Sequence, residues 1–471
     1  MRKLLTCILT AGLVLSLPGA ASAVEVKVNG QWQFSFGYYS RNTLTKNSDT
    51  GEHADRTLFR QRMRTQVRFI ADENLSALFN FEIGDLTWGN GPSGGGLDAD
   101  GKEVKVKHAY LDWILPQTAI KTRWGIQGLR LPWVVAGNPI MDADVAGITV
   151  NNQFTPEVGL TVFYARPYDK YWGTDGQTNG RNLNDEMDMA GFMVPVSTEY
   201  VRMTPWAMGA LIGRDSGYFG DAGYRGIGVV TGGSGNYAGR GRALLNPDDA
   251  DSRIYGYWFG TTLEMPFIDP FFAQIDAMAG GLRTGDSDSD SFGYFLAGNV
   301  GYAFAFGKLS AIGWYSSGDK DKDDRGIMPI ISDDNGFGLT SYGLQGKRWR
   351  NYDSVLSLNG LGMWGVGVQL ADVSFIDDLK HTVRGMYMRG TNSGDAVLGS
   401  GEGNRAPYEH GYLLSSDKAW EVNLLNEYQV SDNLTLGLDF AYVWLDLGEQ
   451  RTNSDDTSGS FAAMLGMQYA F

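Results

Sequence analysis

Apolar and polar residues alternate strictly along the last segment of the chain. Residues 461 to 471 read FAAMLGMQYAF, and the odd positions carry Phe461, Ala463, Leu465, Met467, Tyr469 and Phe471. A period of two is typical of a β-strand with one apolar face. Because the alternation continues to Phe471, we predict a strand that ends at the C-terminus.

The same pattern recurs along the chain in segments of about ten residues, as in transmembrane barrels. The predicted strands are 26–41, 58–71, 75–84, 104–115, 120–127, 146–154, 158–166, 187–196, 200–212, 254–265, 271–282, 292–305, 308–316, 361–371, 379–389, 419–429, 434–446 and 460–471. Short turns such as 72–74 and 431–433 alternate with long loops such as 213–253 and 317–360. This rhythm predicts both termini at the short-turn end and therefore an even number of strands.

The predicted fold is all-β: a transmembrane antiparallel up-and-down β-barrel. Eighteen strands are preferred, and sixteen stay open because 187–212 and 361–371 alternate weakly. No apolar run of about 20 residues follows residue 23, which argues against membrane-spanning helices. A soluble antiparallel sandwich would alternate as well. The 13 Trp, 23 Tyr and 23 Phe, many near strand ends, favour a barrel with aromatic belts.

The N-terminus has the organisation of an export signal. A basic start at Arg2 and Lys3 precedes an apolar run from Leu4 to Leu17, and residues 21–23 fit an A-x-A cleavage site. We predict a signal peptide over 1–23 and a barrel over 24–471. Cleavage would remove Cys7, the only cysteine. A lipoprotein interpretation of Cys7 is disfavoured because almost no apolar run precedes it.

The acidic balance of the chain bears on its partners. The formal charge of −15 becomes −17 when Arg2 and Lys3 are removed. Such acidity argues against nucleic acid as a partner.

The second predicted strand carries the most informative charges. Read with a period of two, Arg60, Arg62, Arg64 and Arg68 share one face, opposite Phe59, Met63, Val67 and Phe69. An arginine that faces lipid at mid-bilayer costs roughly 2–4 kcal/mol, so we expect this column to face water inside the barrel. Lys121 and Arg123 join the wet face by the same argument. An amphipathic helix is the alternative for this segment alone, because its apolar residues also recur every three to four positions.

Several segments resemble general bacterial porins. They are the signal peptide, the arginine-rich strand, HAYLDW at 108–113, RWGIQG at 123–128 and the final QYAF. More narrowly, the chain resembles the outer-membrane homotrimeric porins of sulfate-reducing bacteria. The resemblance implies a trimer of water-filled barrels, and a loop after the fifth strand that folds inward and narrows each barrel. Here that loop would be roughly Leu129 to Val145. Its acidic residues Asp142 and Asp144 would face the basic wall.

Other kinds of chemistry have little support in the sequence. The four histidines are scattered, and there is no H-E-x-x-H pair, G-x-S-x-G elbow or cysteine nucleophile, so we predict no enzyme and no cofactor. The acidic segments 286–290 and 319–323 resemble calcium loops but do not complete the pattern, and we predict no metal site. A structural anchor without an open pore would have the same barrel and stays an alternative.

These patterns together predict an outer-membrane porin of a Gram-negative cell that admits small hydrophilic solutes and ions by passive diffusion. A substrate-selective porin for anions or organic acids is the other channel-forming alternative. The arginine column favours anions, whereas the acidic loops favour cations. Expected partners are outer-membrane lipid and lipopolysaccharide, two further copies in a homotrimer, and the barrel-assembly machinery. That machinery would read the C-terminal signature at Tyr469 and Phe471.

Overall fold

In the computed structural model, the described residues are 24–41, 52–53, 55–98, 104–169, 186–213, 216, 253–285, 290–320, 326, 328–331, 339, 360–394, 413–451 and 459–471. The predicted signal peptide over 1–23, Cys7 included, lies outside them. No helix in this part of the chain is long and apolar enough to cross a membrane.

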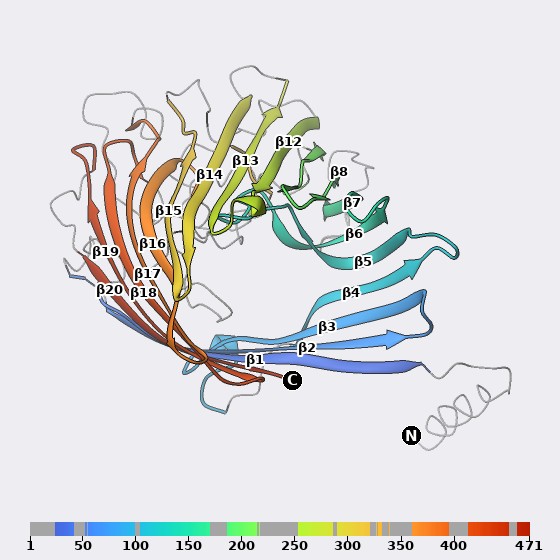
Figure 1. The fold of residues 1–471 in the computed structure, drawn as a ribbon, viewed down its shortest axis with the longest axis horizontal. Coiled ribbons are helices and arrows are strands. Elements are labelled where there is room, and N and C mark those ends of the chain that lie inside the picture. Colours follow the sequence, from blue (N-terminus) through green and yellow to red (C-terminus); the bar gives the residue numbers. More distant parts are fainter. Residues whose placement is uncertain are drawn as a thin grey trace.

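The described residues form one antiparallel sheet of twenty strand segments (Figure 1). They are β1 Glu25–Tyr39, β2 Arg56–Ile70, β3 Leu75–Thr87, β4 Val104–Ile114, β5 Lys121–Arg130, β6 Asp142–Gln153, β7 Gly159–Asp169, β8 Glu186–Met193, β9 Val196–Ser197, β10 Arg202–Met203, β11 Trp206–Gly213, β12 Arg253–Glu264, β13 Phe271–Arg283, β14 Ser291–Phe304, β15 Gly307–Ser316, β16 Met363–Ile376, β17 Leu379–Gly390, β18 Lys418–Ser431, β19 Leu434–Asp446 and β20 Ser460–Ala470. Two 3-10 helices, η1 Gly91–Ser93 and η4 Pro266–Ile268, lie between strands.

Two barrel strands are each interrupted by a proline. Pro195 separates β8 from β9, and Pro205 separates β10 from β11. A proline has no backbone N–H and cannot complete a ladder. The chain nevertheless continues in the same direction, because Val194 N donates to Pro205 O at 2.9 Å and β9 pairs with β10. The twenty segments are therefore eighteen barrel strands, which confirms the preferred count and makes sixteen wrong.

The sheet closes on itself through its first and last strands. β1 pairs with β20 in a register that places Trp32 beside Tyr469. Phe471 extends the ladder, because Gly30 N donates to Phe471 O at 2.8 Å and Phe471 N donates to Gly30 O at 3.0 Å. Each of the other strands pairs with its neighbours in the chain. The result is the predicted up-and-down barrel.

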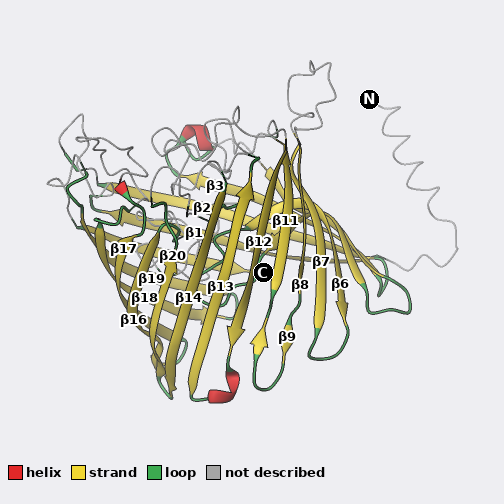
Figure 2. Ribbon diagram, turned by 90° about the horizontal axis from the view of Figure 1, so that it is seen from above, coloured by secondary structure: helices red, strands yellow, loops and turns green. Residues whose placement is uncertain are grey.

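The connections have two lengths, as predicted from the sequence. Eight short turns lie at one end of the barrel, at 71–74, 115–120, 154–158, 198–201, 265–270, 305–306, 377–378 and 432–433. Figure 2 shows several of these turns below the strands, with the η4 turn among them. The long connections lie at the opposite end.

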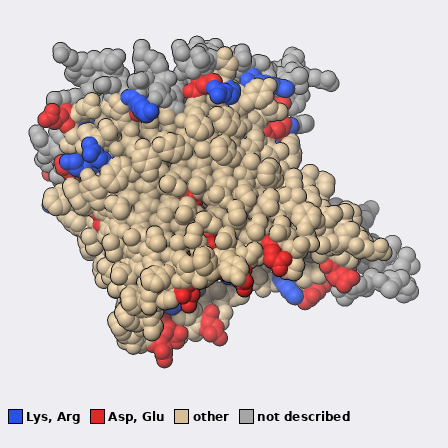
Figure 3. Space-filling view, turned by 45° about the horizontal axis from the view of Figure 1, so that its top comes forward, with Lys and Arg blue, Asp and Glu red and all other residues tan. Residues whose placement is uncertain are grey.

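The two faces of the wall differ in composition. On β1, Trp32 and Tyr38 are exposed whereas Gln33 and Ser35 are buried. The outer face seen in Figure 3 is largely free of charged side chains, which gather near its two ends. Rings stack along this face, as between Tyr469 and Phe471, whose centroids are 5.9 Å apart. The predicted strand phases therefore hold, with apolar residues outward.

Part of the interior is packed with apolar side chains. Trp206, Trp258 and Trp314 from β11, β12 and β15 are almost fully buried. They belong to one cluster with Leu131 and Ile140 from the segment between β5 and β6. The sequence pattern had suggested an inner face that is polar throughout. Instead, this part of the inner face is apolar.

The lack of a side chain at Gly30 should stabilise the closed barrel. A Cβ there would lie 2.5 Å from Arg64 O and 2.7 Å from Phe471 Cζ. We predict that Gly30→Ala lowers the free energy of unfolding by about 1–3 kcal/mol, the usual effect of overpacking. The measurement is the temperature at which the folded form is lost in detergent. Gly385→Ala on β17 is the control, because a Cβ there meets nothing within 4 Å. Equal losses in both variants would contradict the prediction.

Candidate functional site

The predicted basic column lies on the inner phase of β2. In the β1–β2 ladder, Arg60 is opposite Ser35, Arg62 opposite Gln33, and Arg64 opposite Gln31. Ser35 and Gln33 are buried, whereas their neighbours Phe34, Phe36 and Trp32 alternate with them on the outer phase. The column therefore points to the interior, in the phase that the sequence predicted.

Two of these arginines are held by neighbours across the ladder. Arg62 Nη2 donates to Gln33 Oε1 at 2.9 Å, and Gln33 Nε2 donates to Gln468 Oε1 at 2.8 Å. Arg64 Nε donates to Glu82 Oε2 on β3 at 2.6 Å. Charge-assisted hydrogen bonds of this kind are stronger than neutral ones and fix the guanidinium planes.

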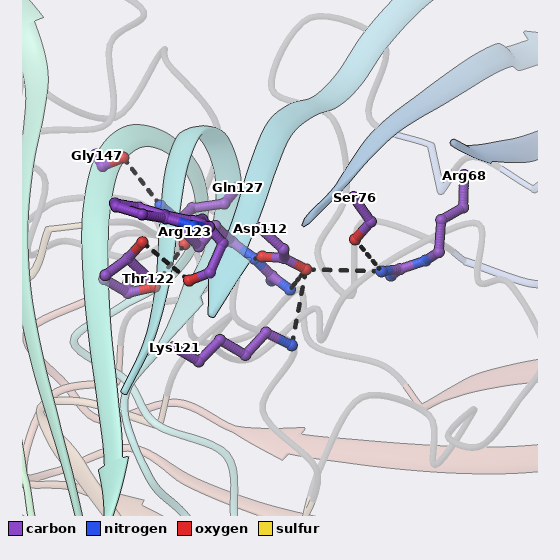
Figure 4. A network of polar contacts seen from close by, with 10 residues as sticks. Arg68, Ser76, Asp112, Lys121, Thr122, Arg123, Gln127 and Gly147 are labelled. Carbon is purple, nitrogen blue, oxygen red and sulfur yellow. Dashed lines mark hydrogen bonds and ion pairs between the residues drawn. The ribbon is translucent and has the colours of Figure 1, made fainter. Parts of the chain in front are cut away.

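Asp112 on β4 brings together three further cations, Arg68, Lys121 and Arg123 (Figure 4). Arg123 binds it with two nitrogens, at 2.7 Å and 3.0 Å. Arg68 and Lys121 approach its Oδ2 at 3.6 Å and 3.7 Å. The Arg123 guanidinium also lies 3.8 Å above the centre of the Tyr110 ring, a favourable cation-π position. Asp112 is 3 % exposed, so its charge is buried but well paired.

The basic wall, which we define as Arg60, Arg62, Arg64, Arg68, Lys121 and Arg123, carries an excess of positive charge. The carboxylates of Glu82 and Asp112 pair with four of these six cations, Arg64, Arg68, Lys121 and Arg123. The side chains of Arg68 and Lys121 are 36 % and 45 % exposed, so part of this charge is accessible from the interior. Such a surface attracts anions and orients dipolar solutes.

The segment between β5 and β6 folds into the barrel. Residues 131–141, which we call the inner loop, read LPWVVAGNPIM and contain no charged side chain. Asn138, 1 % exposed, organises its turn: its Nδ2 donates to Pro132 O, and its Oδ1 accepts from Ile140 N at 2.9 Å. Gly137 has φ 92°, a conformation that favours glycine.

Asp276 on β13 anchors the inner loop. Its carboxylate accepts three backbone N–H groups in succession, from Val134 at 2.7 Å, Val135 at 2.8 Å and Ala136 at 3.2 Å. β13 lies six barrel strands away from β5, so the loop crosses the interior to reach it. Asp276 is fully buried. The three donors compensate the cost of removing this carboxylate from water.

A second contact supports the inner loop from the long-loop end. Ile331 N donates to Ile140 O at 2.8 Å, and Trp258 Nε1 donates to Pro329 O at 2.8 Å. Residues 328–331 therefore bridge the inner loop and the β12 wall.

The structure corrects the predicted place of two acidic residues. Asp142 and Asp144 belong to β6 and not to a loop, because the β5–β6 ladder continues to Arg130 opposite Asp142. Asp142 forms an ion pair with Arg130 at 2.7 Å. Asp144 binds Lys107 and, at 2.8 Å, His108 Nε2. Both acids lie at the long-loop end of β6, directly after the inner loop in the chain, and Leu129 to Val145 was too wide a range for that loop.

Sequence reasoning missed the residues that organise this site. Asp276 was the most visible of them, since it is the only acid of β13 and lies on its inner phase. Glu82 and Asp112 also occupy positions that face the interior when their strands are read with a period of two. Their partners could not be inferred, because the sequence of a single strand does not specify its register with the neighbouring strand.

No group of three or more His, Cys, Asp or Glu side chains that could hold a metal ion occurs among the described residues. The predicted acidic segments lie largely outside them, at 286–289 and 321–323. Their relation to divalent cations stays untested.

Comparisons with known proteins show the fold. The sequence matches no protein-family model and no curated protein. Among solved structures, Acinetobacter baumannii OccAB3 is similar with a TM-score of 0.51 at 10 % identity, over 94 % of this chain and 99 % of that one. Pseudomonas aeruginosa OpdQ has a TM-score of 0.50 at 12 % identity, over 95 % and 98 %. A BenF-like porin from Pseudomonas fluorescens Pf-5 has a TM-score of 0.50 at 9 % identity, over 94 % and 99 %. The chain thus has the closed eighteen-stranded barrel fold of outer-membrane porin structures.

Proposed function

We propose that this chain forms a channel in the outer membrane for passive diffusion of small hydrophilic solutes and ions. The observation that carries the proposal is the inner loop, which crosses the barrel and is anchored on Asp276. A loop held in this way narrows the passage without closing the wall. Selection then depends on the width of the passage and on the charge beside it.

The outer surface supports placement in a membrane. Trp32, Phe461 and Leu465 are among the apolar side chains that face outward and are exposed. Six cations on the other phase point away from that surface. Had the register shifted by one residue, each would meet lipid at a cost of roughly 2–4 kcal/mol at mid-bilayer. The long-loop end would then face the lipopolysaccharide layer.

The basic wall should set the selectivity. Because the inner loop carries no charged side chain, the charge beside the passage comes from the surrounding wall, which includes the basic wall on β2 to β5 and Asp276 on β13. Charges beyond about 8–10 Å are screened at physiological salt, so the acidic loops have less effect there. We propose a preference for anions.

A substrate-selective porin is the second candidate. Its support is the apolar cluster that fills part of the interior, which leaves less room than an unobstructed barrel. One structurally similar protein is described as a BenF-like porin. The narrower kinship with homotrimeric porins of sulfate-reducing bacteria, a trimeric state and recognition of Tyr469 and Phe471 by the assembly machinery are further proposals.

Removal of two arginines tests the anion preference. In planar bilayers under a salt gradient, we predict a zero-current potential that indicates anion preference and shifts toward cations in Arg62→Ala/Arg64→Ala. Arg283→Ala is the control, because Arg283 is exposed on the outer phase of β13 and pairs with Asp290. A folded protein that never conducts would refute the channel itself.

Loss of the Asp276 anchor should loosen the inner loop. An amide at this position presents one acceptor oxygen and an NH₂ group that faces the loop donors, so Asp276→Asn loses charge-assisted bonds worth about 1.5–3 kcal/mol each. We predict larger or noisier single-channel conductance and faster proteolysis between residues 131 and 141. Asp446→Asn, which removes an exposed acid from β19, is the control. Unchanged conductance in a folded Asp276→Asn barrel would contradict a constricting role.

A further inference from the structure

A second polar feature lies on the inner wall, on the short-turn side of the inner loop. A cavity of about 520 Å³ is lined by Glu264, Phe272, Gln274, Asn299, Ser310 and Gln369, among others. Gln274 is two residues from Asp276 on the same phase of β13 and therefore faces the interior. The cavity is thus adjacent to the narrowest part proposed above.

The hydrogen bonds in this cavity fix the orientation of its amides. Glu264 can only accept, so Gln274 must donate its Nε2 to Glu264 Oε2, at 3.1 Å. Gln274 Oε1 then accepts from Asn299 Nδ2 at 3.0 Å. This order leaves Asn299 Oδ1 buried without a donor among the described residues. This oxygen is inaccessible from the cavity, so Asn299 contributes to the lining by holding Gln274 in place.

A third amide is oriented from the other side. Arg384 has donors only, and its Nε donates to Gln369 Oε1 at 2.8 Å. The Nε2 group of Gln369 is therefore directed away from Arg384. Ser310, also in the lining, can both donate and accept. Donors and acceptors are therefore present together in this cavity.

The charges that border the cavity are nearly balanced. Glu264, Asp269 and Asp372 are opposed by Arg202 and Lys308, and Lys308 pairs with Asp372 at 2.9 Å. A carboxylate or an amine would each meet both attractive and repulsive charges here, so neither sign of charge is favoured by the lining. Hydroxyl groups donate to carboxylates and accept from amides, so a neutral polyhydroxylated molecule satisfies both. Phe272 adds an apolar surface, since its ring covers Gly301, where a Cβ would lie 2.5 Å from Phe272 Cζ.

We propose that this cavity is a binding subsite for neutral polyhydroxylated solutes of saccharide type. It rests on the proposed channel function for its physiological meaning, because it would hold solutes beside the inner loop. Binding itself does not require conduction. The binding subsite and the channel function can therefore be refuted separately.

The test is equilibrium binding of maltose to the full-length mature protein in detergent, followed by saturation-transfer NMR. Succinate and putrescine serve as anionic and cationic probes. We expect saturable maltose binding that is tighter than binding of either charged probe. Asn299→Ala and Gln369→Ala should each weaken it about five-fold, as expected for loss of one hydrogen bond. Asn80→Ala removes a buried amide from β3 and should leave binding unchanged.

Three outcomes would overturn the subsite: no saturable maltose binding, tighter binding of succinate or putrescine, or equal loss in Asn80→Ala. Folding of each variant is checked by its heat-dependent gel mobility. Maltose binding without any channel conductance would refute the channel and leave the subsite standing. Conductance without maltose binding would do the reverse.

Discussion

The whole structure depends on closure of the sheet between β1 and β20. In a hydrocarbon layer, every backbone N–H and C=O must find a partner within the protein, and a sheet achieves this only when it has no free edge. The chain meets this requirement by pairing residues more than 430 positions apart, such as Gln33 and Gln468. The absence of a side chain at Gly30 leaves room for the Phe471 ring at this seam.

Closure of the sheet also determines which face of the barrel wall carries the charged side chains. Because side chains alternate along a strand, one register places all members of the basic wall inside and all of their neighbours outside. A bulge opposite Gln61 and Arg62 accommodates one extra residue of β3, Asp85, which follows Gly84, whose φ is 147°. Between this bulge and the short turn that follows β2, Arg64 pairs with Glu82. Arg68, closer to that turn, approaches Asp112. The wall is thus a paired network with a positive excess, and its arginines are held in fixed positions.

Strand periodicity was enough to predict most of the barrel. Each of the eighteen predicted segments matches a barrel strand, and the weak alternation of 187–212 is explained by Pro195 and Pro205. Segment 361–371 was predicted too short, because β16 continues to Ile376 beyond an irregular pairing near Asp372. Local pattern could not locate the inner loop anchor, since Asp276 lies about 140 residues from its partners. It also misplaced Asp142 and Asp144, because a turn and a strand end look alike when charged residues end the alternation.

The composition of the inner loop explains why its anchor must be a carboxylate on the opposite wall. Apart from Asn138, the loop LPWVVAGNPIM has few polar side chains, so its own backbone supplies most of the polar groups that need partners. Three successive N–H groups converge on one point, and a carboxylate is the side chain that accepts several donors at once. An apolar loop held from outside would limit the width of the proposed passage without adding charge. In the proposed channel, size selection would therefore reside in the loop and charge selection in the wall, so each could change by mutation without the other.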